Sequence, residues 1–103
     1  MRGSTSLKLP LDCWQFIQDM RASPAGATLP DDLRDILGRV PSIEVRPPIS
    51  EPKFVVVMTR PQAEALQRWL RELLDGLARN DDRRLTCFQC IGRVAVAIRL
   101  SET

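Results

Sequence analysis

The apolar residues near the start of the chain recur every three or four positions, as they do on one face of an α-helix. This pattern predicts a first helix over residues 11–22. The predicted inner face of that helix carries Cys13, Trp14, Phe16, Ile17 and Met20. A second helix is expected to begin with Thr28 as its N-cap, because Pro30 then falls in the first turn, where a missing N–H is not needed. Gly38 is a suitable residue to end this helix.

The period of the pattern shortens to two in the middle of the chain, as expected for β-strands. Residues 42–46 alternate between apolar and polar and predict a short strand. Residues 53–58 are β-branched, aromatic and apolar on both faces, so they predict a strand in the centre of a sheet. The proline-rich residues 47–52 are expected to form a stiff, extended connection. Residues 1–10 are expected to be a flexible N-terminal arm.

The clearest single element is a long amphipathic helix over about residues 60–78. Thr59 and Gln62 have the spacing of a capping box, and Pro61 fits the first turn. The apolar stripe of this helix consists of Leu66, Trp69, Leu70, Leu73, Leu74 and Leu77. Charged residues occupy the opposite face and form pairs four positions apart, such as Glu64 with Arg68. The helix is therefore expected to pack one face on a sheet.

The last part of the chain is interpreted as β-structure. Residues 79–84 are polar and predict a loop, whereas residues 85–100 are strand-like with a change of phase at Gly92. A hairpin at residues 91–92 explains the change of phase, and so does a bulge in one long strand. The predicted order is α-α-β-β-α-β-β. We expect a two-layer α+β sandwich in which one long helix packs on a mostly antiparallel sheet of three or four strands, with two additional N-terminal helices.

Composition limits the class of protein. Of the 103 residues, 44% are hydrophobic and 27% are charged, a balance typical of a globular chain, and residues 11–103 are expected to form a single small domain. The net charge of +2 comes from 15 basic and 13 acidic residues, which does not favour nucleic acid or a membrane as a partner. The sequence shows no apolar export segment, and the longest apolar run, residues 54–58, is too short to cross a bilayer.

Three cysteines are the first candidates for chemistry. Cys87 and Cys90 have the spacing of half a zinc site or of a redox dithiol. With Cys13 as the only further cysteine and no histidine in the chain, a four-ligand zinc site is incomplete. If residues 85–100 form a strand, side chains three positions apart point to opposite faces and cannot form a disulfide. We expect three reduced, buried thiols, no cofactor and no metal, in a cytoplasmic protein.

An enzymatic function has little support in the sequence. The absence of histidine removes the usual general base, and there is no glycine-rich phosphate loop. The acidic residues lie at helix starts, on solvated helix faces or in loops, so no catalytic residue is assigned. A small ligand binder or enzyme with a pocket between the N-terminal helices and the sheet remains an alternative.

Arginines supply a second alternative, a nucleic-acid-binding domain. An arginine edge would consist of Arg79, Arg83, Arg84, Arg93 and Arg99. Asp81 and Asp82 separate the arginines of the predicted loop, and no aromatic residue accompanies them to stack on bases. Specific binding of nucleic acid is therefore not expected.

The leading expectation is a non-catalytic protein-interaction module that forms a homodimer. Residues 54–58 are apolar on both faces, and one long helix covers only one of them. In the predicted last strand, Ala95 and Ala97 lie between Arg93 and Arg99, and small residues there allow a second chain to approach. These four residues are the predicted interface, which Ala97→Arg is expected to disrupt without unfolding the chain.

Overall fold

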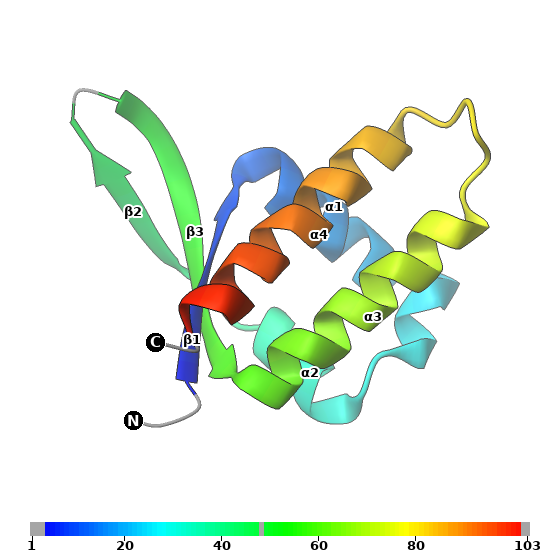
Figure 1. Ribbon diagram of the computed structural model, residues 1–103, viewed down its shortest axis with the longest axis horizontal. Helices are drawn as coiled ribbons and strands as arrows, with labels where there is room; N and C mark the ends of the chain where they lie inside the picture. Colours follow the sequence, from blue (N-terminus) through cyan, green and yellow to red (C-terminus); the bar gives the residue numbers. More distant parts are fainter. Residues whose placement is uncertain (1–3, 48, 102–103) are drawn as a thin grey trace.

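The computed structural model describes residues 4–47 and 49–101. Within these ranges the chain is a compact α+β domain with the element order β-α-α-β-β-α-α, apart from one short 3₁₀ helix. A three-stranded antiparallel sheet packs against the helices, which all lie to one side of it (Figure 1). The α+β class is confirmed, whereas the predicted order of elements is wrong at both ends of the chain.

The first correction concerns the N-terminal arm, because Ser4–Pro10 forms strand β1. Thr5, Leu7 and Leu9 point into the core, while the residues between them are exposed. This strict alternation is the pattern of a strand with one buried face. The segment joins the sheet because β3 offers a long partner with which it pairs antiparallel, from Ser4 opposite Thr59 to Pro10 opposite Lys53.

The predicted central strand is confirmed. Strand β3, Ile49–Thr59, lies between β1 and β2, Ser42–Arg46, in the order β1-β3-β2. β3 begins within the predicted connection 47–52, of which Pro48 lies outside the described residues. The hairpin of β2 and β3 projects beyond the helices (Figure 1), so its apolar residues near the tip are exposed.

The two N-terminal helices are confirmed, and Gly38 ends the second as predicted, but the predicted N-cap of the second is wrong. Helix α1, Leu11–Ala22, follows β1 directly, and a 3₁₀ turn over Pro24–Thr28 connects it to helix α2, Asp31–Leu37. Thr28 lies inside the 3₁₀ turn and does not cap α2, which begins after Pro30. The turn packs so tightly that position 26 requires glycine, since a Cβ atom there would lie 1.9 Å from the carbonyl oxygen of Arg21.

Helix α3, Arg60–Gly76, confirms the predicted capping box. The backbone N–H of Gln62 donates to Oγ1 of Thr59 at 3.3 Å, and the N–H of Thr59 donates to Oε1 of Gln62 at 2.9 Å. The helix ends two residues earlier than predicted. The Arg84 guanidinium donates to the carbonyl oxygens of Leu74 and Leu77 at 3.1 and 2.9 Å and so satisfies the end of α3.

The largest correction is that residues predicted as strands form a continuous helix, α4, over Arg83–Leu100. Neither a hairpin at residues 91–92 nor a bulged strand is present there. The predicted polar loop shortens, since Arg83 and Arg84 belong to the helix. The side chains that α4 buries are Cys87, Cys90, Val94 and Ala97, a helical spacing of three and four. Packing of this face outweighs the low helix propensity of the β-branched residues.

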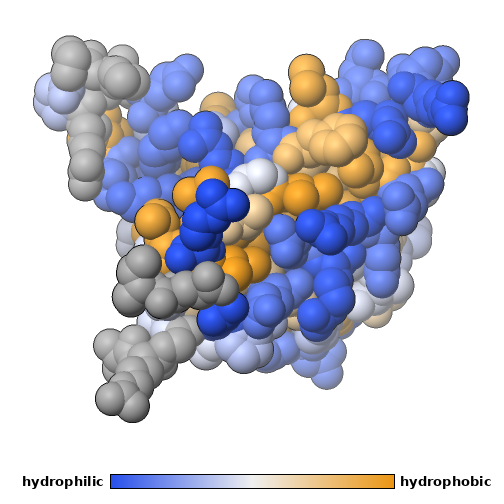
Figure 2. Space-filling model, viewed as in Figure 1, coloured by the Kyte–Doolittle hydropathy of each residue, from blue (hydrophilic) through white to orange (hydrophobic). Residues whose placement is uncertain are grey.

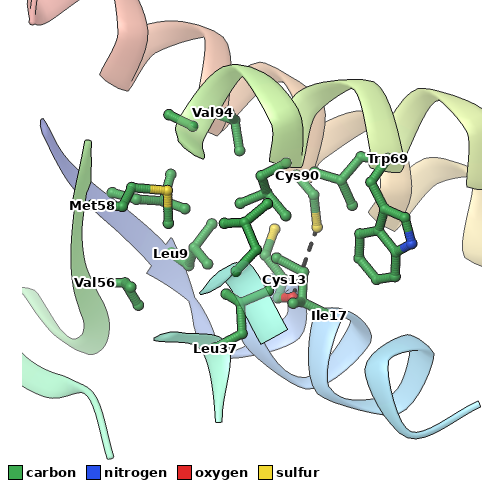
Figure 3. Packing of buried hydrophobic residues seen from close by; sticks show 14 of the residues in the cluster. Leu9, Cys13, Ile17, Leu37, Val56, Met58, Trp69, Cys90 and Val94 are labelled. Carbon is green, nitrogen blue, oxygen red and sulfur yellow. Dashed lines mark hydrogen bonds between the residues drawn. The ribbon is translucent and has the colours of Figure 1, made fainter. Parts of the chain in front are cut away.

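The core lies between the inner face of the sheet and the helices (Figure 3). Trp69 is buried, and its indole N–H donates to the carbonyl oxygen of Ala25 and to Oγ1 of Thr28, each at 3.1 Å. At the margin of the core, the rings of Trp14 and Phe54 stack with centroids 5.7 Å apart. No helix in the described ranges is long and apolar enough to span a membrane.

Candidate functional site

The outer face of α4 carries an unusual amount of exposed apolar surface. Leu85, Phe88, Val96 and Leu100 are between 54% and 68% exposed, and they recur along one side of the helix together with Gly92. We call these five residues the outer stripe. Figure 2 shows the corresponding band of hydrophobic surface running along α4. Because α4 also buries its opposite face, it is apolar on both sides, which is typical of a helix that is covered on both sides.

The outer stripe is nearly symmetrical about Gly92. Phe88 lies four residues before this glycine and Val96 four residues after it, while Leu85 and Leu100 lie seven before and eight after. A Cβ atom placed on Gly92 would have no neighbour within 4 Å. A glycine in a helix interior destabilises the helix by about 1 kcal/mol relative to alanine, and no close contact within the described chain accounts for this one.

The two ends of α4 differ in charge. Asp82 precedes the helix and is exposed, whereas Arg99 lies exposed in the last turn. The neighbouring Asp81 is already held by Arg83, whose guanidinium donates to its two carboxylate oxygens at 3.1 and 2.8 Å. These hydrogen bonds lower the pKa of Asp81 to about 2. Asp82 at one end and Arg99 at the other are thus exposed groups of opposite charge, while the exposed Arg83 beside Asp82 is paired with Asp81.

The residues predicted as a strand interface lie on α4 and do not share one face. Arg93 and Arg99 are exposed, Ala95 is half-buried and Ala97 is buried. The carbonyl oxygen of Ala97 accepts a hydrogen bond of 2.8 Å from Oγ1 of Thr5 on β1. The strand geometry behind that prediction is wrong, and Ala97 packs against this chain's own sheet.

The arginines considered for nucleic acid are dispersed. Arg83 is paired with Asp81, and Arg84 binds the end of α3. Arg79 is exposed in the loop before α4, whereas Arg99 lies near the other end of that helix, about 24 Å from Arg83 at 1.5 Å per residue. The structure therefore does not bring the five arginines together on one edge.

The cysteines are buried inside the helical layer. Cys87 and Cys90 share the inner face of α4, because they lie three positions apart on a helix and not on a strand. The Cys87 thiol donates to the carbonyl oxygen of Leu70 at 3.3 Å, and burial raises the pKa of Cys87 to about 11. Cys90 lies against Cys13 of α1, with Sγ 3.8 Å from the Cys13 carbonyl oxygen (Figure 3). Hydrogen bonding to Cys13, together with burial, raises the pKa of Cys90 as well.

Two further candidates gain no support from the geometry. Among the described residues, no group of three or more cysteine, aspartate or glutamate side chains is placed to hold a metal ion. The hollow between the end of α2 and the sheet has a volume of about 170 Å³. It is smaller than typical small-molecule sites of about 300–1,000 Å³, and Arg39 on its rim already pairs with Asp35 at 2.9 Å.

The outer stripe was missed because residues 85–100 were interpreted at a period of two. With a helical period, Leu85, Phe88, Gly92 and Val96 follow one another at intervals of three and four on one face. The intervals between Cys87, Cys90, Val94 and Ala97 define a second face in the same way. The spacing of these residues thus indicates a helix with two apolar faces.

Comparisons with protein-family models, curated proteins and solved structures found no match for this chain.

Proposed function

We propose that this domain is a protein-interaction module that self-associates, with the outer stripe of α4 as its homodimer interface. The observation that carries the proposal is the row of four exposed apolar side chains arranged around Gly92. Burial of apolar surface is the main favourable term in most protein association. The proposal is therefore still a homodimer, as expected from the sequence, but the interface lies on a helix face and not on a sheet face.

The arrangement of the outer stripe favours a second copy of the same chain. In a two-fold interface the same surface meets itself, so each residue contacts its counterpart in reversed order. If two α4 helices cross antiparallel at Gly92, Phe88 of each copy lies against Val96 of the other. The glycines at the crossing allow the two backbones to approach closely, which gives Gly92 a role that nothing in the described part of one chain supplies.

Charge supports the antiparallel direction. The end of α4 that Asp82 precedes then lies beside the end of the second helix that carries Arg99. Opposite charges at the rim of an interface fix its register and orientation more than they add to its affinity. A parallel pair would instead place Asp82 beside the second Asp82 and Arg99 beside the second Arg99.

Light scattering behind size exclusion at micromolar concentration tests self-association. We expect about twice the monomer mass of 11.6 kDa. Phe88→Glu and Val96→Glu should each shift the mass to that of the monomer, because they place a charge in the dry centre of the interface. Both side chains are half exposed, so the folded monomer keeps its circular dichroism spectrum.

Val40→Glu is the matched control, since Val40 is 94% exposed and lies outside the outer stripe. It makes the same change of chemistry and should leave the mass unchanged. A wild-type mass near 11.6 kDa across a tenfold dilution series contradicts the proposal. An equal effect of the control variant contradicts the assignment of the interface to α4.

Charge reversal tests the direction of the helices. Asp82→Arg and Arg99→Asp should each weaken the dimer, and the double variant should recover most of the lost affinity. Additive weakening in the double variant shows that the two side chains do not meet and rules out the antiparallel register.

A further inference from the structure

The two edge strands of the sheet differ in how well they can accept another strand. β2 is five residues long and its pairing with β3 is irregular between Glu44 and Arg46. β1 is seven residues long and pairs with β3 in unbroken register. Bulges and short lengths protect sheet edges from further pairing, whereas a regular edge presents a row of unpaired N–H and C=O groups. No strand of the described residues lies on the outer side of β1.

The open edge of β1 lies beside a groove. The C-terminal half of α4 runs along β1, and between them is an open hollow of about 370 Å³. Ser4, Ser6 and Lys8 line the side of β1, while Arg93, Val96 and Leu100 line the side of α4. Val96 and Leu100 are more than half exposed, so the α4 wall of the groove presents accessible apolar side chains next to Arg93.

The charge of the groove is one-sided. Lys8 and Arg93 both line it, and no aspartate or glutamate of the described residues does. Nζ of Lys8 lies 3.4 Å from Oε1 of Glu44 across the sheet, but this pair is solvent-exposed and therefore weak. Arg93 is exposed on the opposite wall. An occupant with carboxylates matches the groove better than one with basic side chains.

We propose that the groove between β1 and α4 binds an extended acidic segment of a partner protein, which adds to the sheet as a further strand on β1. Only an extended chain can satisfy the row of backbone groups on a strand edge. Its side chains alternate, so every second one faces Val96 and Leu100 and should be apolar. The side chains between them lie beside Ser6 and Lys8 on the open face of the sheet and should be acidic. The recognised pattern is thus alternating apolar and acidic residues.

Fluorescence anisotropy with labelled peptides tests this proposal. The probe is a decapeptide of alternating valine and glutamate, and we expect saturable binding that weakens with salt. The counterpart with lysine in place of glutamate should bind at least tenfold more weakly. So should a peptide with proline at two central positions, because proline removes backbone donors. Equal binding of all three peptides, or no saturable binding of the first, overturns the proposal.

Variants of the protein locate the site. The double variant Lys8→Ala with Arg93→Ala removes the cation beside the acidic side chains and the one that attracts them from across the groove, and should lower the affinity for the acidic peptide at least tenfold. Arg68→Ala with Arg71→Ala, which removes two exposed cations from α3, should leave it unchanged. In hydrogen exchange, the bound peptide should slow exchange of amides within residues 4–8. Unchanged exchange there, or equal loss in both double variants, overturns the placement.

The test separates this proposal from self-association. Val96 and Leu100 border both surfaces, so the titration is repeated with Phe88→Glu, which alters the outer stripe but not the groove. Binding by this variant supports the groove whatever the oligomeric state of the wild type. If the wild-type dimer survives Phe88→Glu and the acidic peptide dissociates it, the edge of β1 is occupied by a second copy, and a partner segment is not its natural occupant.

Discussion

Helices α3 and α4 are of similar length and pack side by side, yet their outer faces differ in kind (Figure 1). α3 buries Leu66, Trp69 and Leu70 and turns charged residues such as Arg68 and Arg71 outward. α4 buries an equally apolar face and turns a second apolar row outward. The outer face of α3 is charged and solvated, as expected for a surface helix of a monomeric protein. Helix α4 has more apolar surface than the described chain covers, which is why we propose the interface there.

The largest expected effect tests which face of α4 is inside. Ala97→Arg should destabilise the fold by about 4 kcal/mol, because it forces a charged side chain into a buried position against β1. Urea denaturation followed by circular dichroism measures the change. Val96→Arg, one residue earlier on the exposed face, is the control and should change the stability of the monomer by less than about 0.5 kcal/mol. Similar losses in the two variants would mean that α4 has no distinct inner face.

A matched pair of leucines compares the two helices directly. Leu70→Ala on α3 removes a fully buried side chain and should cost about 2–5 kcal/mol. Leu85→Ala on α4 removes an exposed side chain, so the monomer should lose less than about 0.5 kcal/mol. The dimer of Leu85→Ala should nevertheless dissociate at a higher protein concentration than the wild type. Denaturation at two protein concentrations separates the effects, and a large loss at both concentrations for Leu85→Ala would place that side chain in the core.

Cys87, which lies buried between α4 and α3, should make the stability of the fold depend on pH. The pKa of Cys87 is raised to about 11 in the folded chain, so the fold favours the neutral thiol. Its contribution is complete below the ordinary thiol pKa of 9.0 and is lost as the pH rises from there toward 11. The loss is on the order of 2–3 kcal/mol for this thiol. Tyrosine, which titrates in the same range, is absent from the chain.

Urea denaturation at pH 8, 9.5 and 11 measures this effect. Cys87→Ala is the control and should show a shallower fall with pH. An equally steep fall in the control would show that other groups are responsible. In the native protein at pH 8, a thiol reagent should react with none of the three buried cysteines, as also expected for reduced, structural thiols.

The smallest expected effect concerns Gly92. Gly92→Ala should stabilise the monomer by about 0.5–1 kcal/mol, because alanine loses less conformational entropy in a helix and none of the described residues obstructs the new methyl group. The same variant should weaken the dimer, because the methyl groups separate the crossing helices. Thermal unfolding of a monomeric background and light scattering of the wild-type background give the two values. A stronger dimer would show that the helices do not cross at this residue.

What could be predicted from the sequence depended on how local each signal was. The capping box of Thr59 and Gln62 and the apolar run of β3 lie within a few residues, and both were predicted correctly. β1 was missed because its alternation acquires meaning only when β3 pairs with it from about fifty residues away. α4 was missed because valine and isoleucine favour strands locally, whereas packing on α3 and β1 decides for a helix. The candidate site was missed for the same reason, because the residues of the outer stripe share one face only when the segment is helical.

The hydrogen bond from Thr5 to Ala97 has a consequence for how the chain reaches this fold. It joins residues 92 positions apart, and β1 must also find β3 across most of the domain. Contacts of such wide sequence separation slow folding, because the chain loses the entropy of closing a long loop before the contact can stabilise it. During synthesis, β1 leaves the ribosome well before β3 and α4, so its backbone cannot yet pair with β3. The strand that we propose as a docking edge thus has no strand partner in the growing chain until β3 has been synthesised.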